Sequence, residues 1–199
     1  MNGTTKDMES NLNLRKKFLF CLLILSTLFI SGCATNNLES KTITIKQPLN
    51  QVSEIGAREG NIAPDFAVIT TEGKAVVLGD FVRNNKPVLI YFFATWCPYC
   101  HHDLQALSKV YEQYKNNVSI VAISLDLSED AQKIIKYKTN YPEIQSAFFA
   151  PGTNDILTKY QVIRTTTKFA VSRNGTIIYS GFGAFDEGQW KILLEALSK

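Results

Sequence analysis

A long apolar run that ends in two closely spaced cysteines is the strongest constraint on the fold of this chain. Residues 87–96 have the sequence PVLIYFFATW, and Cys97-Pro98-Tyr99-Cys100 follows at once. A β-branched and aromatic run of this length predicts a buried strand, and cysteines three positions apart at the start of the next helix share one face of it. Two sulfur atoms at this spacing can form a disulfide.

The first cysteine of the pair is the expected nucleophile. Cys97 would lie at a helix N-terminus, where unpaired backbone N–H groups and the helix dipole favour a thiolate. Cys100 would then resolve a mixed disulfide by intramolecular displacement. A static disulfide is the alternative, although a bond that closes so small a loop restrains the unfolded chain little. We therefore expect a redox-active pair.

The first 33 residues have the pattern of a bacterial export signal. Arg15, Lys16 and Lys17 precede an apolar stretch, residues 18–30, that is too short to span a bilayer comfortably. The stretch ends in ISGC, which resembles a lipobox with Cys33 as the lipidated residue, although an ordinary signal peptide with a nearby cysteine is the alternative. We expect residues 1–32 to be removed and residues 33–55 to form a lipid-anchored tether. The protein would then be held at a membrane on its extracytoplasmic side, in a periplasm or at the outer cell surface.

Cysteine usage and charge narrow the function further. Of the four cysteines, Cys21 lies in the predicted signal and Cys33 is the predicted lipid site, which leaves Cys97 and Cys100. A lone CxxC pair in an oxidising compartment indicates redox chemistry first and metal binding second. The formal net charge is +3, and no basic cluster follows the signal. Nucleic acid is therefore not an expected partner.

The order of the expected elements predicts an α/β fold, in which a mixed central sheet has helices on both faces. In such a sheet the loop with Cys97 emerges at the carboxyl end of its strand, the usual functional edge. The expected strands are 63–68, 74–78, 88–93, 118–125, 144–149, 168–172 and 176–180. The expected helices are 98–114, 130–137, 154–160 and one that starts near Asp186 with a capping box to Gln189.

From about residue 56 to the end, the chain resembles the exported thiol-disulfide oxidoreductases of the TlpA/ResA type. The resemblance implies a thioredoxin-like domain over residues 56–199, with an N-terminal strand pair and an αβ insertion. It also implies a redox centre that needs no cofactor beyond the disulfide between Cys97 and Cys100. The matching segments are Ala63-Pro64-Asp65-Phe66, the run from Phe92 to Cys100, the insertion after Leu125, and Tyr160-Gln161-Val162. Peroxiredoxins share the first segment, but their threonine three residues before the peroxidatic cysteine would fall at Ala94.

The resemblance implies particular partners as well. Relatives act on thiols or disulfides of exported proteins, and many reduce the cysteines of apocytochrome c. A membrane-bound or soluble thiol protein would supply the electrons. The direction of electron flow does not follow from Pro98 and Tyr99, because the potential depends on the relative stability of thiolate and disulfide forms.

The chain departs from its relatives at two positions. Cytoplasmic thioredoxins have a buried aspartate six residues before the first cysteine, and this chain has Tyr91 there. The family usually has a cis-proline where this chain has Thr166. Either Thr166 follows a trans bond in a rerouted loop, or the fold imposes a strained cis bond. Because this loop normally docks substrate, Thr165 and Thr166 are candidate docking residues.

Other side chains near the cysteines, Pro98 and Tyr99 among them, are candidates for tuning the site or docking substrate. Trp96 is the expected lid over the dithiol and is expected to form part of the core. His101 lies four residues after Cys97 and would stabilise its thiolate when protonated, or else lie on a solvated helix face. Asp126, near the end of a buried strand, would shuttle protons or, through its spacing to Glu129, begin the next helix.

Two rival readings of the cysteine motif remain. Residues 97–101 also match the attachment motif of c-type haem. Copper or zinc could bind Cys97, Cys100 and His101, because thiolates are soft ligands. We expect no metal site, and the alternative function is a metal-binding or redox-sensing module without turnover.

Overall fold

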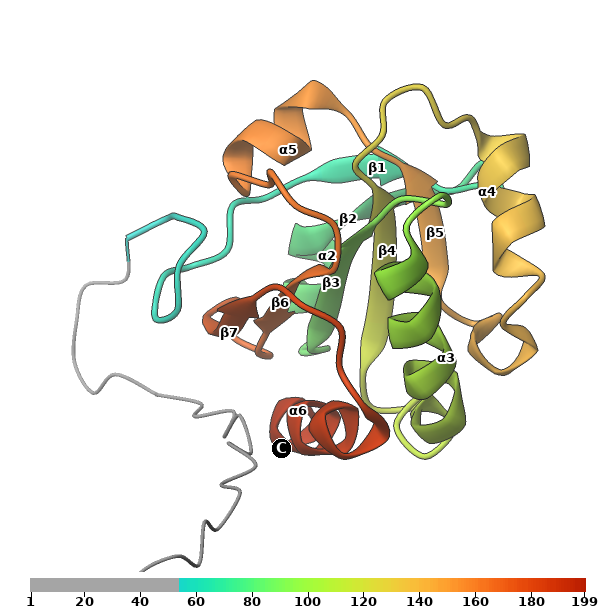
Figure 1. Ribbon diagram of the computed structural model, residues 1–199. Coiled ribbons are helices and arrows are strands. Elements are labelled where there is room, and N and C mark those ends of the chain that lie inside the picture. The colour runs from blue at the N-terminus through green and yellow to red at the C-terminus, as the bar shows by residue number, and fades with distance from the viewer. Residues whose placement is uncertain (1–53) are drawn as a thin grey trace, which may run out of the picture. The chain divides into compact units, whose positions relative to one another are not determined.

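The computed structural model describes residues 54–199 (Figure 1). The predicted signal peptide, the predicted lipid site Cys33 and residues 34–53 lie outside the described residues. Between residues 54 and 199, no helix has the length and apolar character needed to cross a membrane.

The centre of the domain is a mixed five-stranded sheet with the strand order β5-β4-β3-β6-β7. The strands are β3 (Val88–Phe93), β4 (Ser119–Ser124), β5 (Phe148–Pro151), β6 (Thr167–Val171) and β7 (Ile177–Gly181). Strands β3, β4 and β5 are parallel, whereas β6 pairs antiparallel with both β3 and β7. The sheet confirms the predicted α/β class.

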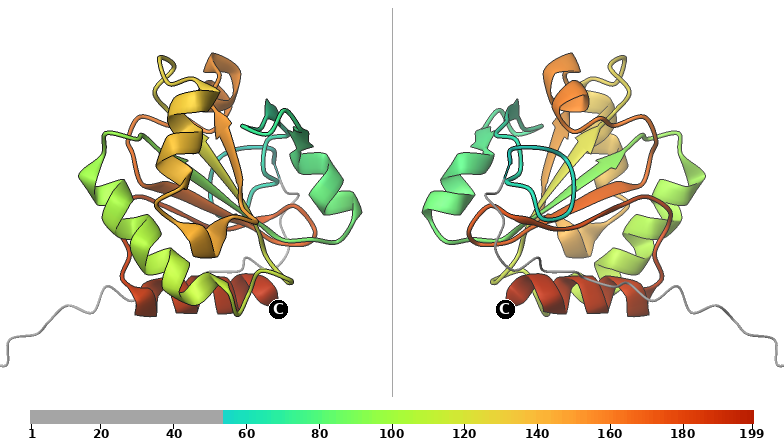
Figure 2. Two further views of the ribbon diagram at one scale, coloured as in Figure 1. Left: turned by 90° about the vertical axis from the view of Figure 1, so that its right-hand side faces the viewer. Right: turned by 90° about the vertical axis from the view of Figure 1, so that its left-hand side faces the viewer.

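Strand β3 is buried on both faces, which explains its unbroken apolar sequence. Side chains alternate along a strand, so Tyr91 and its neighbours two positions away face one layer while Phe92 faces the other. The first layer contains α3 (Pro98–Tyr111), α4 (Ala131–Lys138) and α6 (Glu187–Ser198). The second contains α2 (Leu78–Arg83) and α5 (Asn154–Lys159). Figure 2 shows α3 and α2 on opposite sides of the sheet.

The predicted N-terminal strand pair is present but shorter than expected. Strand β1 (Ala67–Ile69) pairs antiparallel with β2 (Ala75–Val77), and Gly73 supplies the left-handed residue of the turn, with φ 76°. Helix α2 follows β2 directly and was not predicted. Leu78 is its only buried residue, so its sequence has no apolar periodicity that would mark a helix.

The segment around residue 144 corrects the prediction of a strand over 144–149. Pro142–Ile144 form a 3₁₀ helix, η1, and the strand begins only at Phe148. Proline suits the first position of a helical turn, and the buried side chain of Ile144 holds that turn in the core. Pairing with β4 then sets the register of β5, from Val121 opposite Phe148 to Ser124 opposite Pro151. Together, α4, η1 and β5 form the predicted αβ insertion.

The C-terminal part follows the prediction closely. The Asp186 carboxylate accepts from Gln189 N at 2.8 Å, and Gln189 Oε1 accepts from Asp186 N at 3.1 Å, which is the predicted capping box of α6. The free edge of β7 is covered by an N-terminal segment, since Gly60 N donates to Ile177 O and Ile177 N to Asn61 O. This cover protects an edge that could otherwise pair with another chain.

Candidate active site

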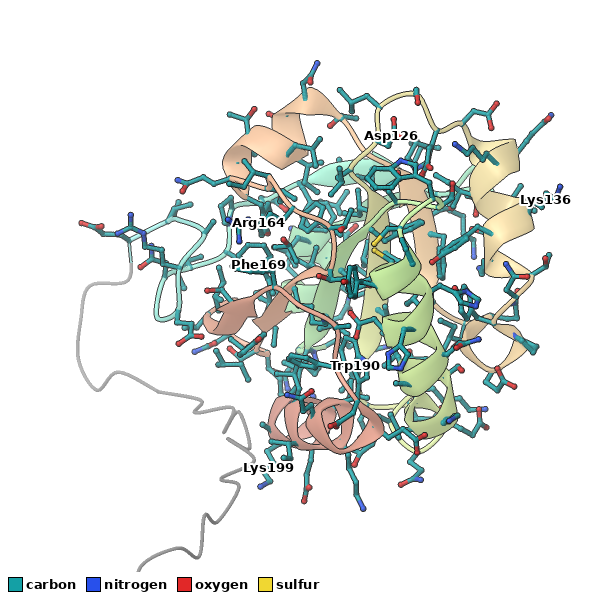
Figure 3. All side chains as sticks on the ribbon, in the orientation of Figure 1. Asp126, Lys136, Arg164, Phe169, Trp190 and Lys199 are labelled. Atoms are coloured by element: carbon teal, nitrogen blue, oxygen red, sulfur yellow. The ribbon has the colours of Figure 1, made fainter. Side chains whose placement is uncertain are left out.

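The two cysteines lie where β3 ends and α3 begins. Cys97 is the N-cap of α3, with Pro98 in the first turn, and its Sγ accepts from Cys100 N at 3.1 Å. The two thiols are not bonded to each other, and both are buried. Figure 3 shows the sulfur atoms at the N-terminal end of α3. Cys97 Sγ therefore caps the first turn of the helix, as the side chain of an N-cap residue does.

The loop with Thr165 and Thr166 lies against Cys97. The Cys97 thiol donates to Thr165 Oγ1 at 3.2 Å. Thr166 is buried with φ 61°, and its Oγ1 accepts from Gly183 N at 2.9 Å. No peptide bond between residues 54 and 199 is cis. Of the two expected conformations, the rerouted trans loop is therefore the one present.

Trp96 and Asp126 form the exposed rim of the site. Trp96 is 62% exposed, which corrects the expectation that it forms part of the core, and its Nε1 donates to Asp126 Oδ2 at 2.7 Å. Hydrogen bonds from Ser128 and Trp96 lower the pKa of Asp126 to about 2. Asp126 is therefore ionised near neutral pH and orients Trp96. The helix cap expected at Asp126 is instead Asp130, which accepts from Lys133 N at 2.8 Å.

The imidazole ring of His101 makes its hydrogen bonds with residues other than the two cysteines. Its Nδ1 shares a hydrogen bond of 2.6 Å with the Tyr141 hydroxyl, and its Nε2 lies 3.0 Å from the Gln105 amide nitrogen. The role of His101 in stabilising the thiolate stays a prediction. Within residues 54–199, no group of three or more His, Cys, Asp or Glu side chains is arranged to hold a metal ion.

Glu129 supports the loop in front of Cys97, a role that sequence reasoning missed. Its buried carboxylate accepts from Thr95 N at 3.0 Å and from Ser124 Oγ at 2.6 Å. It also lies 3.2 Å from the Lys133 ammonium group. Glu129 thereby joins the Thr95 loop to the end of β4. Its sequence neighbours are polar, so nothing in the pattern distinguishes it from a surface glutamate.

A buried ion pair lies behind the dithiol, and the sequence analysis missed it as well. Asp103 of α3 and Lys168 of β6 are both fully buried, and their charged groups are 2.6 Å apart. The Lys168 ammonium group also donates to the carbonyl oxygens of Thr166 and Gly183, at 3.0 and 2.6 Å. Asp103 Oδ1 accepts from Phe185 N at 2.8 Å. One available signal was the position of Lys168 within an otherwise apolar strand.

Burial controls the protonation of the groups behind Cys97. Loss of solvent raises the pKa of Cys100 to about 12. Burial also raises the pKa of Asp103 and lowers that of Lys168, whereas the attraction between their charges opposes both shifts. The charges of Cys97 and Cys100 act on Lys168 in the same direction as Asp103. Negative charge on the two sulfur atoms therefore favours the cationic form of Lys168.

A cleft opens on the side of the Thr165-Thr166 loop that faces β7. Its volume is about 520 Å³, and it is lined by both arginine and aromatic side chains, among them Arg58 and Tyr160. Arg164 lies over the Phe182 ring at 4.6 Å. Figure 3 labels Arg164 and Phe169, two further residues of this lining. Basic and aromatic side chains thus lie next to the Thr165-Thr166 loop, which contacts Cys97 through Thr165.

Comparison with known proteins identifies the family. The model of the AhpC/TSA family matches residues 60–180. The chain belongs to the AhpC/TSA family. Within the curated proteins, it is 34% identical over 83 residues to the thioredoxin-like protein YneN of Bacillus subtilis (strain 168), with 42% of this chain and 48% of YneN covered. It is 32% identical over 122 residues to the thiol-disulfide oxidoreductase ResA of Bacillus thuringiensis subsp. konkukian (strain 97-27), with 60% of this chain and 66% of ResA covered. The matches thus span about half of YneN and just under two thirds of ResA.

Solved structures confirm the thioredoxin-like fold of this AhpC/TSA family member. A thiol:disulfide interchange protein of the thioredoxin family from Chlorobium tepidum TLS superposes with a TM-score of 0.61 at 18% identity, covering 73% of this chain and all of that one. The resemblance to the TlpA/ResA type is confirmed by the ResA relatives.

The AhpC/TSA fold gathers most of the predicted site residues at one edge of the sheet. Cys97 Sγ contacts both Thr165 Oγ1 and the backbone N–H of Cys100, so the three residues lie together. Trp96 and Asp126 form the rim, and Tyr99 is exposed in the first turn of α3. In this arrangement the cysteines can alternate between dithiol and disulfide, with a buried cation behind them.

Proposed function

We propose that this protein is a thiol-disulfide oxidoreductase that acts on protein disulfides outside the cytoplasm. The observation that carries the proposal is the dithiol itself, with Cys97 Sγ at the N-terminus of α3 and held by Cys100 N and Thr165 Oγ1. The Lys168 cation close behind the sulfurs supports a thiolate mechanism. The ResA relatives, named thiol-disulfide oxidoreductases, support the same reaction class.

The reaction proceeds by two thiol-disulfide exchanges. The Cys97 thiolate attacks one sulfur of a partner disulfide, and a Cys97–partner bond forms while the second partner sulfur leaves with the electron pair and takes up a proton. Cys100 then loses its proton and attacks Cys97 Sγ, which releases the first partner sulfur. The partner gains two electrons, and the enzyme keeps a Cys97–Cys100 disulfide until a donor thiol protein reduces it.

The finer parts of the proposal concern place and partner. A lipid on Cys33 would hold the catalytic domain at the membrane, close to newly exported proteins. Apocytochrome c cysteines are the substrate that the family resemblance implies. The cleft with Arg58 and Arg164 next to the Thr165-Thr166 loop offers a surface for such a chain.

Reduction of insulin by dithiothreitol, with the full chain in detergent as catalyst, tests the central claim. Cys97→Ser should abolish catalysis because the nucleophile is lost. Cys100→Ser should instead accumulate a mixed disulfide with the partner, visible by mass spectrometry, because the resolving thiol is missing. Undiminished turnover in Cys97→Ser would overturn the proposed function.

A further inference from the structure

Three of the four buried side-chain atoms that lack a hydrogen bond in residues 54–199 lie around the dithiol. They are the hydroxyls of Tyr91 and Tyr137 and Asp103 Oδ2, which has only its ion pair with Lys168. A buried polar group without a partner costs about 1–3 kcal/mol of stability. Such a group calls for an explanation, and a catalytic role is one of the recognised ones.

The Tyr91 hydroxyl has a particular position among these atoms. Tyr91 lies in β3 six residues before Cys97, is fully buried, and stands directly opposite Lys168 in the β3–β6 register. The Lys168 ammonium group is 5.3 Å from the centre of the Tyr91 ring. The Tyr91 hydroxyl also acts on Cys100 and Asp103, because it opposes the rise in pKa that burial causes in both groups. It is therefore close to both the resolving thiol and the buried ion pair, although it forms a hydrogen bond with neither in this structure.

We propose that Tyr91 is a catalytic residue of the resolving step, in which its hydroxyl carries the proton of Cys100 to Asp103. This inference rests on the proposed function. The Cys100 proton moves to the Tyr91 oxygen while the Tyr91 proton moves to the Asp103 carboxylate. The Cys100 thiolate, now accepting a hydrogen bond from Tyr91, attacks Cys97 Sγ. The bond between Cys97 and the partner sulfur breaks, and that sulfur leaves with the electron pair and is protonated by water.

The surroundings suit a neutral relay. Burial raises the pKa of Tyr91, so its phenol stays protonated and acts as a donor. The ionisable groups that face it are Cys100 and Asp103 of α3, Lys168 of β6 and Tyr137 of α4. The Lys168 ammonium group lies 2.6 Å from the Asp103 carboxylate, and its attraction lowers the pKa of Asp103 against the effect of burial. The Tyr91 hydroxyl thus stands where cytoplasmic thioredoxins have a carboxylate. The buried carboxylate of this protein is Asp103, which lies in α3.

Substitution of the hydroxyl alone tests the proposal. Tyr91→Phe keeps the ring packing, and the matched control is Tyr160→Phe, in which a buried hydroxyl that donates to Pro64 O on the other face of the sheet is removed. The full chain carrying Cys21→Ser and Cys33→Ser, in which Cys97 and Cys100 are the remaining thiols, is reduced and mixed with excess dithiobis(nitrobenzoate). The first thionitrobenzoate is released when Cys97 attacks the reagent, and the second when Cys100 resolves the mixed disulfide.

Tyr91→Phe should leave the first phase unchanged and slow the second by at least about 10-fold at pH 7, a modest loss for a proton-transfer group. The deficit should shrink as pH rises, because hydroxide can then remove the Cys100 proton. Tyr160→Phe should change neither phase. If the rate of the second phase in Tyr91→Phe stays within twofold of the wild-type rate, the Tyr91 hydroxyl has no part in the resolving step, even if thermal stability changes. Absence of the first phase in the wild type would instead count against the proposed function.

Discussion

Thr166 holds a backbone conformation that its own side chain disfavours. Its φ is 61°, in the left-handed region that β-branched residues rarely adopt. The residue is buried, and the bond from Gly183 N to its Oγ1 holds it in place. A conformation of this kind costs on the order of 1–3 kcal/mol and persists only where the surroundings enforce it. Here it places the neighbouring Thr165 hydroxyl against Cys97.

Restoring the family's proline at this position should therefore destabilise the protein. Proline fixes φ near −65°, so Thr166→Pro cannot follow the present path of the loop. We expect a loss of about 2 kcal/mol or more in the free energy of unfolding, measured by urea denaturation of the reduced protein. Thr166→Gly, which adopts positive φ freely, is the control and should lose less. Wild-type stability in Thr166→Pro would mean that the loop can rearrange.

At the scale of single residues, the sequence predicts reactive groups better than supporting ones. Cys97 and Cys100 are found because their spacing has chemical meaning by itself. Asp103 and Lys168 are 65 positions apart, and charged residues are almost always exposed, so each alone suggests a surface group. Only the packing of α3 against β6 turns them into a pair. Glu129 is hidden for the same reason.

At the scale of elements, α3 and β6 are joined by that ion pair beneath the dithiol. Replacing Lys168 alone leaves the Asp103 carboxylate buried without a counter-charge. Lys168→Met should therefore cost about 3–5 kcal/mol in the free energy of unfolding at pH 7. The double variant Asp103→Leu, Lys168→Met removes both charges and should recover most of the loss. Urea unfolding of the two variants tests this, and equal losses would show that the ion pair is not the cause.

The pH dependence of the single variant has a definite sign. Burial already raises the pKa of Asp103 in the folded protein, and loss of Lys168 would raise it further. The folded state then binds a proton at a pH where the unfolded state does not. The stability of Lys168→Met should consequently recover as pH falls from neutral toward 4, where both states are protonated. The double variant should show no such recovery.

Elements with strong periodicity are predicted well, and those set by their neighbours are not. Strand β3 occupies the predicted residues because its sequence is apolar throughout. Strand β5 begins four residues later than expected, since its register depends on β4 and on the turn at Pro142. Helix α2 buries only Leu78 and gave no sequence signal. Neither of these two errors shifts the cysteines, so the predicted position of the site is unaffected.

At the scale of the whole molecule, the site combines an exposed rim with a buried interior. Trp96 and Asp126 lie at the carboxyl edge of the sheet, open to a partner protein. Cys100, Tyr91 and the ion pair lie in the apolar layer shared by α3, α4 and α6. In the proposed reaction, the rim contacts the partner protein and the interior controls the proton of Cys100. The stability of the whole fold is thereby linked to the ionisation of Cys100.

This linkage makes the reduced protein lose stability in alkali in a predictable way. The pKa of Cys100 is about 12 in the folded state, against 9.0 for an ordinary cysteine. Above pH 9 the unfolded chain loses the Cys100 proton while the folded protein keeps it, so the stabilising effect of this thiol declines as pH rises toward 12. Relative to Cys100→Ser, the reduced wild type should lose up to about 1.4 kcal/mol per pH unit in this range. Other titrating groups, such as the tyrosines, are common to both proteins and cancel in the difference. Urea unfolding of both proteins between about pH 8 and pH 10.5 measures it, and parallel curves would mean that Cys100 ionises like a solvent-exposed thiol.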